Sequence, residues 1–562
     1  MIDENIKAKY QRWLDRVTDS DLLTELQDMN EKRIKEAFYC DLKFGTAGLR
    51  GILGAGTNRM NIYTVAKASQ GLADYVNKNF KRKDRKIAIS RDSRLQSDLF
   101  ADIAARVFAA NGIKVYVYPY ITPVPVLSYA VRYYKCAAGI MITASHNPSK
   151  YNGYKVFGPD GCQITTKATK DIYDIIQTID IFDDIKITSL DEAFESGRAE
   201  YIPPKVLTAY LEDVKKLSMV GDEKINKNFS IVYSPLNGAG LVPCMRILKE
   251  TGYKQITVVK EQEFPNGHFP TCPYPNPEIR EAMELGMQYA YDTQADFLVA
   301  TDPDSDRVGI AVRDGNDFRL MSGDETGVLL FNYICERLTE QGKMPKNPIA
   351  IKTIVSTDMI LQIAKNYGVE VIDVLTGFKY IGEQILLLEQ KGEKDRYIFG
   401  YEESYGYLTG THVRDKDAVN GSFLMCEMFA YYKTHKVSLL DKLEELFNKY
   451  GYQLNKTYPY TFEGKAGLEK IAKLMETLRE RLASGELKCD HYLDFGPGIN
   501  GLPPSNVLKI FLDDDTYFIV RPSGTEPKIK FYISVRAEHQ GLALDKERKI
   551  LRHIIKPLME EF

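Results

Sequence analysis

The feature that most constrains this chain is a strand–helix–strand block that occurs three times, at 86–119, 229–260 and 348–375. Each block combines an apolar strand, a helix with apolar residues at i, i+3 and i+4, a glycine at the helix end and a second strand. A unit of this length predicts two parallel strands with the helix packed across them. We therefore expect an α/β fold with three related domains and mixed, largely parallel sheets.

Each block is followed by a further apolar strand that runs into a polar loop. The three loops are TASHNPS at 143–149, TDPDSDR at 301–307 and GYEESYG at 400–406. In open α/β sheets, ligands bind at loops beyond the carboxyl ends of the strands. Three equivalent loops are therefore expected to line one central cleft.

The C-terminal part of the chain has a different pattern. A long helical segment at 462–484 precedes alternating strands at 506–514, 516–524 and 529–538, which predicts an α+β domain with an antiparallel sheet. The first forty residues are expected to form a helical extension. The predicted domains are domain I at 1–208, domain II at 209–324, domain III at 325–450 and domain IV at 451–562.

The composition agrees with this division and excludes several classes of protein. At about 150 residues per domain, 562 residues correspond to roughly four domains. A net charge of −3 disfavours a general nucleic-acid binder. The eight cysteines form no C-x-x-C motif, so neither a zinc ribbon nor a thioredoxin-like motif is predicted. The N-terminus lacks a secretory pattern and no apolar run is long enough to span a bilayer. We expect a cytoplasmic protein with no membrane and no nucleic-acid partner.

The first loop carries Ser145 on a turn made rigid by the nearby proline. This serine is a candidate nucleophile, although a turn serine without a catalytic role is the commoner case. It does not lie in G-x-S-x-G, so the nucleophile elbow of a hydrolase is not predicted. Lys155, a little downstream, is a cation suited to proton or phosphate chemistry.

The second loop places Asp302, Asp304 and Asp306 at i, i+2 and i+4, where three carboxylates can converge on one hard cation. An EF-hand is excluded because its sixth and twelfth positions are Arg307 and Arg313, and because strands flank the loop. Three acids beside one arginine repel each other strongly without a metal. A solvated acidic turn is the alternative, but the apolar segments on both sides favour a Mg²⁺ site.

The third loop combines Glu402, Glu403 and Ser404 with tyrosines, which suits a polyhydroxylated ligand. A glycosidase pair of carboxylates is disfavoured, because adjacent side chains point in different directions and cannot both act on one bond. Two nearby segments, 376–379 and 412–416, add cations, with ordinary surface charge as the alternative.

A fourth loop, at 521–528, combines an arginine, two hydroxyls, a glycine and a lysine, which indicates a phosphate cradle. A plain turn is the equally weighted alternative, and the loop is not a Walker A motif, so ATP is not implied. The segment 44–51 has glycines that permit close backbone approach, and its Arg50 could clamp an anion.

Taken in order, the Gly/Arg segment, T-A-S-H-N-P, D-x-D-x-D-R, G-x-E-E-S-x-G and R-P-S-G-T resemble the α-D-phosphohexomutase superfamily. The resemblance runs from about Phe44 to Tyr532. It implies four domains around a cleft, an intramolecular phosphotransferase, a phosphoserine and one Mg²⁺ per active site. It also implies a small-molecule sugar phosphate as partner, with glucose 1,6-bisphosphate as activator and intermediate. Whether the protein is a monomer or a dimer is left open.

The resemblance also assigns roles to individual residues. Catalysis is assigned to Ser145, Lys155, Arg50 and His146. The metal is assigned to Ser145, Asp302, Asp304 and Asp306. The sugar site is assigned to Arg307, Thr376, Gly377, Lys379, Glu402, Ser404 and Lys416. The phosphate that does not react is assigned to Arg521, Ser523, Gly524, Thr525 and Lys528.

The sugar loop indicates the branch within the superfamily. Its E-E-S sequence and the downstream HVRDKD are more similar to the phosphoglucomutase and phosphopentomutase branch than to the G-E-M-S-G loop of bifunctional members. We predict the interconversion of glucose 1-phosphate and glucose 6-phosphate. Ribose or deoxyribose phosphate is the leading alternative, followed by mannose phosphate. A non-catalytic sugar-phosphate-binding relative and a hydrolase are further alternatives.

Overall fold

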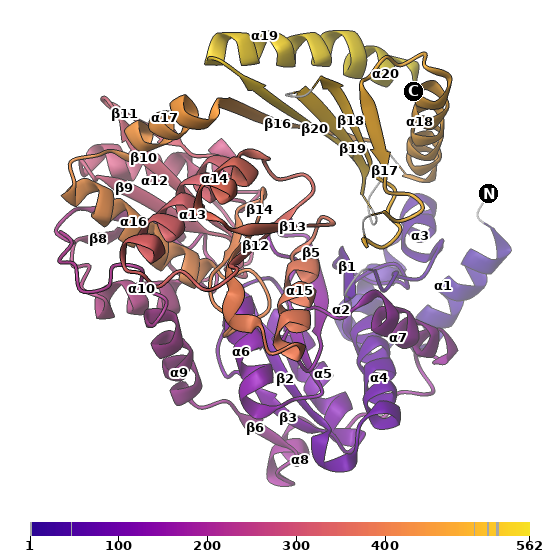
Figure 1. The fold of residues 1–562 in the computed structure, drawn as a ribbon. Helices are drawn as coiled ribbons and strands as arrows, with labels where there is room; N and C mark the ends of the chain where they lie inside the picture. Colours follow the sequence, from indigo (N-terminus) through magenta and orange to yellow (C-terminus); the bar gives the residue numbers. More distant parts are fainter. Residues whose placement is uncertain (1–2, 46–47, 463, 500, 514–515, 524–527) are drawn as a thin grey trace.

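The computed structural model describes residues 3–45, 48–462, 464–499, 501–513, 516–523 and 528–562. Within these residues the chain forms four sheets that follow one another along the sequence (Figure 1). Their strand orders are β1-β5-β4-β2-β3-β6, β11-β10-β9-β7-β8, β13-β12-β14-β15 and β16-β20-β19-β18-β17.

The first sheet combines parallel and antiparallel neighbours. Strand β2 lies between β3 and β4 in parallel, whereas β5 pairs antiparallel with both β4 and β1. The strands are β1 (Gly48–Ile52), β2 (Lys86–Arg91), β3 (Lys114–Val117), β4 (Ala138–Ile142), β5 (Tyr151–Phe157) and β6 (Ala199–Tyr201). The helices are α4 (Ile62–Asn79), α5 (Ser97–Ala110), α6 (Val124–Tyr134), α7 (Thr166–Thr178), α8 (Leu190–Glu195) and α9 (Pro204–Lys215).

The second and third sheets repeat the parallel strand–helix–strand unit of the first. The second contains β7 (Ile231–Ser234), β8 (Ile256–Val258), β9 (Phe297–Thr301), β10 (Val308–Asp314) and β11 (Asp317–Leu320), with α10 (Leu241–Glu250), α11 (Lys260–Glu263) and α12 (Arg280–Asp292). The third contains β12 (Ile349–Thr353), β13 (Glu370–Val374), β14 (Tyr397–Glu402) and β15 (Gly406–Leu408), with α13 (Gly323–Glu340), α14 (Met359–Tyr367), α15 (Phe378–Gln390), α16 (Ala418–Thr434) and α17 (Leu439–Tyr450).

The structure confirms the threefold repeat. In each copy the first two strands are parallel neighbours, namely β2 with β3, β7 with β8 and β12 with β13. The glycine after each helix has a positive φ: +75° at Gly112, +100° at Gly252 and +68° at Gly368. The strands that lead into the three polar loops, β4, β9 and β14, are buried along their whole length. The three loops therefore leave rigid, fully packed strands.

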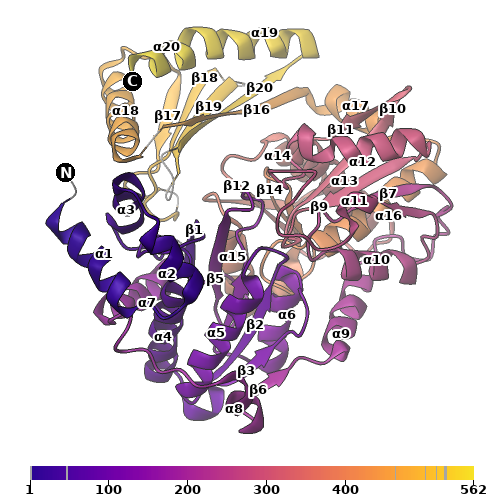
Figure 2. The same ribbon diagram turned by 180° about the vertical axis from the view of Figure 1, so that it is seen from behind.

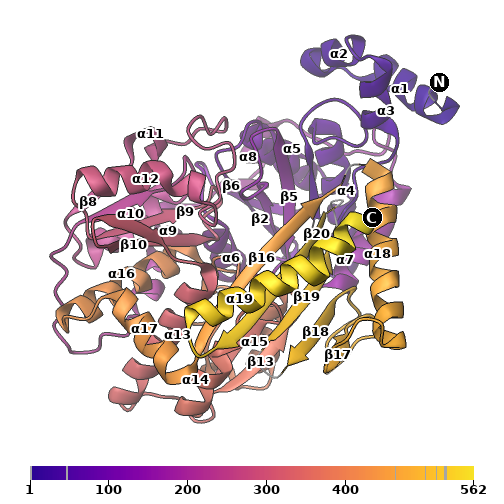
Figure 3. The same ribbon diagram turned by 90° about the horizontal axis from the view of Figure 1, so that it is seen from above.

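The fourth sheet is antiparallel throughout, as the alternating strands predict. It contains β16 (Tyr452–Thr461), β17 (His491–Asp494), β18 (Leu508–Asp513), β19 (Thr516–Pro522) and β20 (Lys528–Ala537), with α18 (Gly464–Ser484), α19 (Gln540–Ile550) and α20 (Lys556–Glu561). Figure 3 shows α19 running along the outer side of this sheet. The sequence pattern did not include β16 and β17.

The chain has more than one apolar core. One buried cluster is continuous from Ala88 in β2 through Val299 in β9 and Ile351 in β12 to Leu446 in α17. The C-terminal sheet has its own core against α18 and α19. It meets the third sheet through a smaller cluster that joins Ile354, Val355 and Leu375 to Phe495, Val507, Tyr517, Ile519 and Tyr532.

The N-terminal extension is helical, as expected. Helices α1 (Glu4–Arg16), α2 (Ser20–Gln27) and α3 (Glu31–Phe38) lie at the outer edge of the molecule, beside the first sheet (Figure 2). They pack around Trp13, which is 2% exposed. Among the described residues, no helix is both long and apolar enough to cross a bilayer.

Candidate active site

Ser145 lies in the loop between β4 and β5 with a left-handed backbone, at φ 53°. Its peptide N–H donates to Thr143 Oγ1 at 2.8 Å. The side chain is turned toward the neighbouring domain, where its hydroxyl donates to Asp302 at 2.9 Å. The same hydroxyl lies 3.1 Å from Nδ1 of His146. The residue is only 3% exposed, so the hydroxyl is shielded from bulk water.

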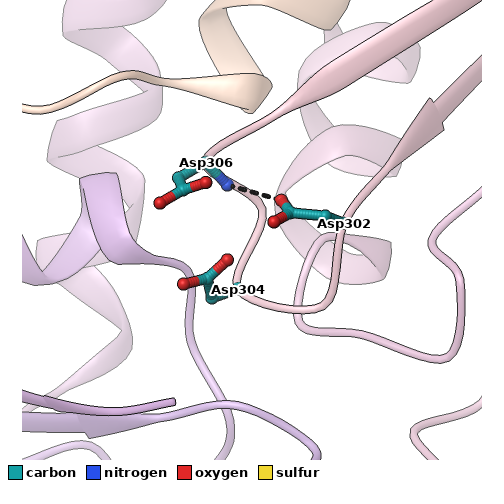
Figure 4. A group of neighbouring side chains, drawn as sticks. All are labelled: Asp302, Asp304 and Asp306. Atoms are coloured by element: carbon teal, nitrogen blue, oxygen red, sulfur yellow. Dashed lines mark hydrogen bonds between the residues drawn. The ribbon is translucent and has the colours of Figure 1, made fainter. Parts of the chain in front are cut away.

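Asp302, Asp304 and Asp306 converge in the loop between β9 and β10 (Figure 4). One oxygen from each carboxylate lies within 4.8 Å of the others, and the three residues are at most 1% exposed. Asp302 accepts the peptide N–H of Asp306 at 3.0 Å and of Arg307 at 2.9 Å, which curls the loop around its own first residue. The i, i+2, i+4 spacing thus gathers the carboxylates, as the sequence predicts.

The donor set fits a hard cation. Oδ1 of Asp304 and Oδ1 of Asp306 are buried and have no hydrogen-bond partner among the described residues. Burial, reinforced by Asp304 and Asp306, raises the pKa of Asp302. Buried acceptors without donors are costly, and a divalent ion ligated by carboxylate oxygens would satisfy them. These three aspartates could therefore bind a metal.

Cations from two other domains surround the metal loop. Lys155 of β5 donates to Asp304 at 2.7 Å and to Asp306 at 3.2 Å. Lys416 lies 3.3 Å from Asp306. Although burial alone would raise it, Lys155, Lys416 and Arg307 hold the pKa of Asp306 below its ordinary value. The site is therefore an alternating cluster of charges contributed by three domains.

The two adjacent glutamates of the sugar loop point in different directions. Glu402, 4% exposed, lies 3.7 Å from Lys416 and so faces the metal loop. Glu403 instead accepts from Thr353 Oγ1 at 3.2 Å. Burial and the charge of Glu402 raise the pKa of Glu403 to about 7, while Lys530 and Arg521 oppose that shift. Glu403 thus faces the C-terminal domain.

The tyrosines of this loop do not frame an open site. Tyr401 and Tyr405 are 0% and 4% exposed. Their hydroxyls donate to Asp324 at 3.3 Å and to the carbonyl of Met321 at 2.8 Å. These rings support the loop from its buried side. The prediction that the two tyrosines face a polyhydroxylated ligand is therefore wrong.

The other predicted sugar residues lie beside the metal loop, on the sugar loop and at the start of α15. Arg307 donates to the carbonyl of Ser404 at 3.1 Å, which joins the metal loop to the sugar loop. Gly377 precedes α15 with φ 122°, and Thr376 Oγ1 is buried without a hydrogen-bond partner among the described residues. Lys379 follows on α15, where burial lowers the pKa of its amine.

The predicted phosphate loop is described in part. Arg521 is the last but one residue of β19 and donates to Tyr532 Oη at 3.4 Å, and the Ser523 N–H donates to the carbonyl of Lys528 at 2.7 Å. Gly524 and Thr525 lie outside the described residues. The sequence pattern missed Lys530 on β20: burial lowers the pKa of its amine, and the charges acting on it include Glu278 and Glu403. Lys530 lies two residues after Lys528, on the same face of the strand, and this spacing is the signal from which it could have been found.

Arg50 and His146 lie beside the serine loop. Arg50, on β1, is exposed and donates to Asn147 Oδ1 at 3.5 Å. Burial, followed by the charges of Arg307 and Arg50, lowers the pKa of His146 well below its ordinary value. The imidazole is therefore neutral near pH 7.

The comparisons with known proteins agree with this geometry. Models of the phosphoglucomutase/phosphomannomutase family for alpha/beta/alpha domains I, II and III match residues 41–181, 208–315 and 322–450. A phosphoglucomutase of Staphylococcus saprophyticus is 35% identical over 541 residues, covering 94% of this chain and 96% of the relative. The chain belongs to the phosphoglucomutase/phosphomannomutase family. A phosphoglucomutase of Staphylococcus aureus is 34% identical, over 93% of this chain and 95% of the relative.

Solved structures of the family share the fold. The pp63/parafusin phosphoglucomutase of Paramecium has a TM-score of 0.67 at 18% identity, covering 91% of this chain and 95% of that one. A phosphoglucomutase/phosphomannomutase family protein of Burkholderia thailandensis also has a TM-score of 0.67, at 19% identity, covering 91% and 96%. The family consists of enzymes that transfer phosphoryl groups, which is the chemistry that a buried serine beside a cation site can support.

Proposed function

We propose that this protein is a phosphoglucomutase that interconverts glucose 1-phosphate and glucose 6-phosphate. The observation that carries the proposal is the 2.9 Å contact between Ser145 Oγ and Asp302, inside a buried carboxylate triad. A nucleophilic hydroxyl joined to a cation site is what phosphoryl transfer through a serine requires. The names of the relatives at 34–35% identity over nearly the whole chain support the choice of sugar.

In the proposed cycle, Ser145 carries a phosphoryl group in the active enzyme. The free hydroxyl of a sugar monophosphate attacks the phosphorus, the bond from phosphorus to Ser145 Oγ breaks, and glucose 1,6-bisphosphate forms. The bisphosphate turns over in the cleft and returns its other phosphoryl group to Ser145. The proton of the attacking sugar hydroxyl has to reach Ser145 Oγ when the bond to phosphorus breaks, and His146, whose Nδ1 lies 3.1 Å from that oxygen, would relay it.

Asp302, Asp304 and Asp306 would hold one Mg²⁺ together with an oxygen on Ser145, and such an ion would neutralise charge on the transferring group. Lys155 and Arg50 add positive charge near the same group. Glu402 and Ser404 would bind sugar hydroxyls with Thr376 and Gly377, helped by Arg307, Lys379 and Lys416. The loop containing Arg521, Ser523, Gly524, Thr525 and Lys528 would bind the phosphate that is not reacting.

The cleft also needs to exclude water, which would hydrolyse the phosphoserine. The near-complete burial of Ser145 supports this part of the proposal. The proposed domain boundaries at 208, 324 and 450 give each domain one of the four loops. A hinge near Tyr450–Lys456 would let domain IV open and close over the substrate.

Coupled assays with glucose 1-phosphate, mannose 1-phosphate and ribose 1-phosphate test the substrate. We expect glucose 1-phosphate to give the highest kcat/KM; a higher value for ribose 1-phosphate would make the enzyme a phosphopentomutase. Intact-mass measurement should show a phosphate on the wild type that Ser145→Ala lacks. Release of free phosphate alone would indicate a hydrolase, and no turnover of any sugar would indicate a binding relative. The monomer or dimer state and the cytoplasmic location stay predictions.

A further inference from the structure

Arg94 lies behind the serine loop and binds its backbone at four points. Its guanidinium donates through one terminal nitrogen to the carbonyls of Pro148 and Tyr151, both at 3.0 Å. Through the other it donates to the carbonyl of Ser145 at 2.5 Å and to that of Asn147. The residue is 3% exposed. All four terminal N–H groups of the guanidinium therefore donate to backbone carbonyls of the segment 145–151.

Arg94 is itself held from two sides. Asp92 lies 3.4 Å from its Nε, in an ion pair that is fully buried on both sides. On the other side, the ring of Phe269 lies 5.2 Å from the guanidinium carbon. Phe269 is 1% exposed and belongs to the connection between α11 and α12 in the second domain. The loop that carries the serine is thus supported by residues from two domains.

The same support reaches the metal loop. Asp92 accepts the hydroxyl of Thr143 at 2.6 Å. Thr143 Oγ1 in turn accepts the Ser145 N–H at 2.8 Å and lies 3.2 Å from Asp304. A continuous set of contacts therefore runs from Arg94 through Asp92 and Thr143 to both Ser145 and Asp304.

The backbone of Ser145 needs such support. A non-glycine residue at φ 53° is in a sparsely populated conformation that persists only where its surroundings enforce it. The planar fork of an arginine can bind several carbonyls in fixed directions, which a lysine cannot do.

We propose that Arg94 is a positioning residue for phosphoryl transfer: it holds the Ser145 loop in the conformation that points the hydroxyl at Asp302. The proposal rests on the proposed mutase function of Ser145. Arg94 does not touch the substrate; it acts through the carbonyls of the loop. A displacement of the reacting group by about 1 Å can lower the rate on the order of 10²-fold.

The test compares Arg94→Lys with Arg91→Lys. Arg91 is the control: it is the last residue of β2, three positions before Arg94, and it donates to the carbonyls of Tyr118 at 3.0 Å and Pro119 at 3.3 Å, outside the serine loop. We expect Arg94→Lys to lower kcat by about 10²-fold with KM for glucose 1-phosphate changed by less than about threefold. Arg91→Lys should keep kcat within about twofold.

A second variant and a second readout separate position from folding. Asp92→Asn keeps the guanidinium and should lower kcat by about tenfold. Hydrogen–deuterium exchange of the peptide spanning 143–151 should rise in Arg94→Lys and not in Arg91→Lys. A wild-type kcat in Arg94→Lys, or unchanged exchange in that peptide, would overturn the proposal. A wild-type enzyme inert toward all three sugar phosphates would instead overturn the proposed function, and exchange would then decide whether Arg94 holds the loop.

Discussion

The three α/β domains and the C-terminal domain are attached to the molecule in different ways. The first domain also has a buried cluster of its own, but one continuous apolar core runs through all three domains. They join at the candidate site through Ser145–Asp302 at 2.9 Å, Lys155–Asp304 at 2.7 Å and Lys416–Asp306 at 3.3 Å. The C-terminal domain has a core of its own. It meets the third domain through a small apolar cluster and an ion pair between Lys509 and Asp358 at 3.0 Å.

On the proposed function, this difference would separate two tasks. Chemistry on phosphorus needs atoms held within a fraction of an ångström, and a shared core with short ion pairs can hold them there. Binding the non-reacting phosphate of a sugar bisphosphate that turns over in the cleft needs an adjustable partner. A domain with its own core can move as a unit and so can adjust. A pocket of about 280 Å³ lies between the two parts, lined by Glu403 and Asp324 on one side and by Lys456, Tyr532 and Ser534 on the other.

The largest effect on activity is expected in the three α/β domains that share a core. Asp304→Asn should lower kcat by at least about 10³-fold, because the metal contributes several kcal/mol of charge stabilisation in the transition state. Mg²⁺ at about 100 times its Kd should stabilise the wild type by about 2.7 kcal/mol, and thermal melts should show no such shift for the variant. The matched control is Asp314→Asn at the exposed end of β10, which should retain both properties. Full activity in Asp304→Asn would contradict the metal assignment.

A smaller effect, on KM and not on kcat, is expected in the C-terminal domain. Arg521→Ala should raise KM for glucose 1-phosphate by about 10- to 100-fold, since charge-assisted hydrogen bonds contribute about 1.5–3 kcal/mol. Steady-state kinetics would measure it, with Arg521→Lys as the variant that keeps the charge and recovers part of the loss. If kcat fell a thousandfold at constant KM, the division of tasks between the two parts would be wrong.

The attachment of the C-terminal domain can be weakened directly. Lys509→Met removes the ion pair to Asp358 and the contact of the lysine with the Tyr517 ring, 4.0 Å from its nitrogen. Asp358 keeps Lys352 at 2.8 Å, so we expect a loss of only about 1–2 kcal/mol of stability. Thermal melts would measure this loss, and KM should rise a few-fold. Lys546→Met removes an ion pair to Asp513 within the same domain and should leave KM unchanged.

The smallest effect concerns pH. Because burial and Glu402 raise the pKa of Glu403 from 4.5 to about 7, the folded protein binds this proton more tightly than the unfolded chain. The resulting stability is complete below the unfolded pKa and is lost as the pH rises through about 7. Wild type should therefore lose about 1–2 kcal/mol relative to Glu403→Gln between about pH 5 and about pH 8. Parallel pH dependences of the two melting temperatures would show that Glu403 stays ionised.

Much of the fold was predictable because its signals are local. The strand–helix–strand blocks are confirmed at β2–α5–β3, β7–α10–β8 and β12–α14–β13, and the aspartate spacing predicts a cluster that the structure contains. Local signals failed where a residue's partner is distant in sequence. Asp92 and Arg94 lie in a segment whose pattern predicts only a turn. Lys530 lies in a segment whose pattern predicts only a strand, so neither pattern shows which residues these side chains contact.

The sequence by itself determined the kinds of elements and the chemical groups that each loop carries, since periodicity and residue type are properties of neighbouring positions. Only the tertiary structure decided which way those groups face. Glu402 and Glu403 are adjacent, yet one meets Lys416 and the other Thr353. Tyr401 and Tyr405 are buried beneath their loop, although the sequence pattern predicts that they face a ligand. Direction depends on what packs against each side of a strand, and those partners lie elsewhere in the sequence.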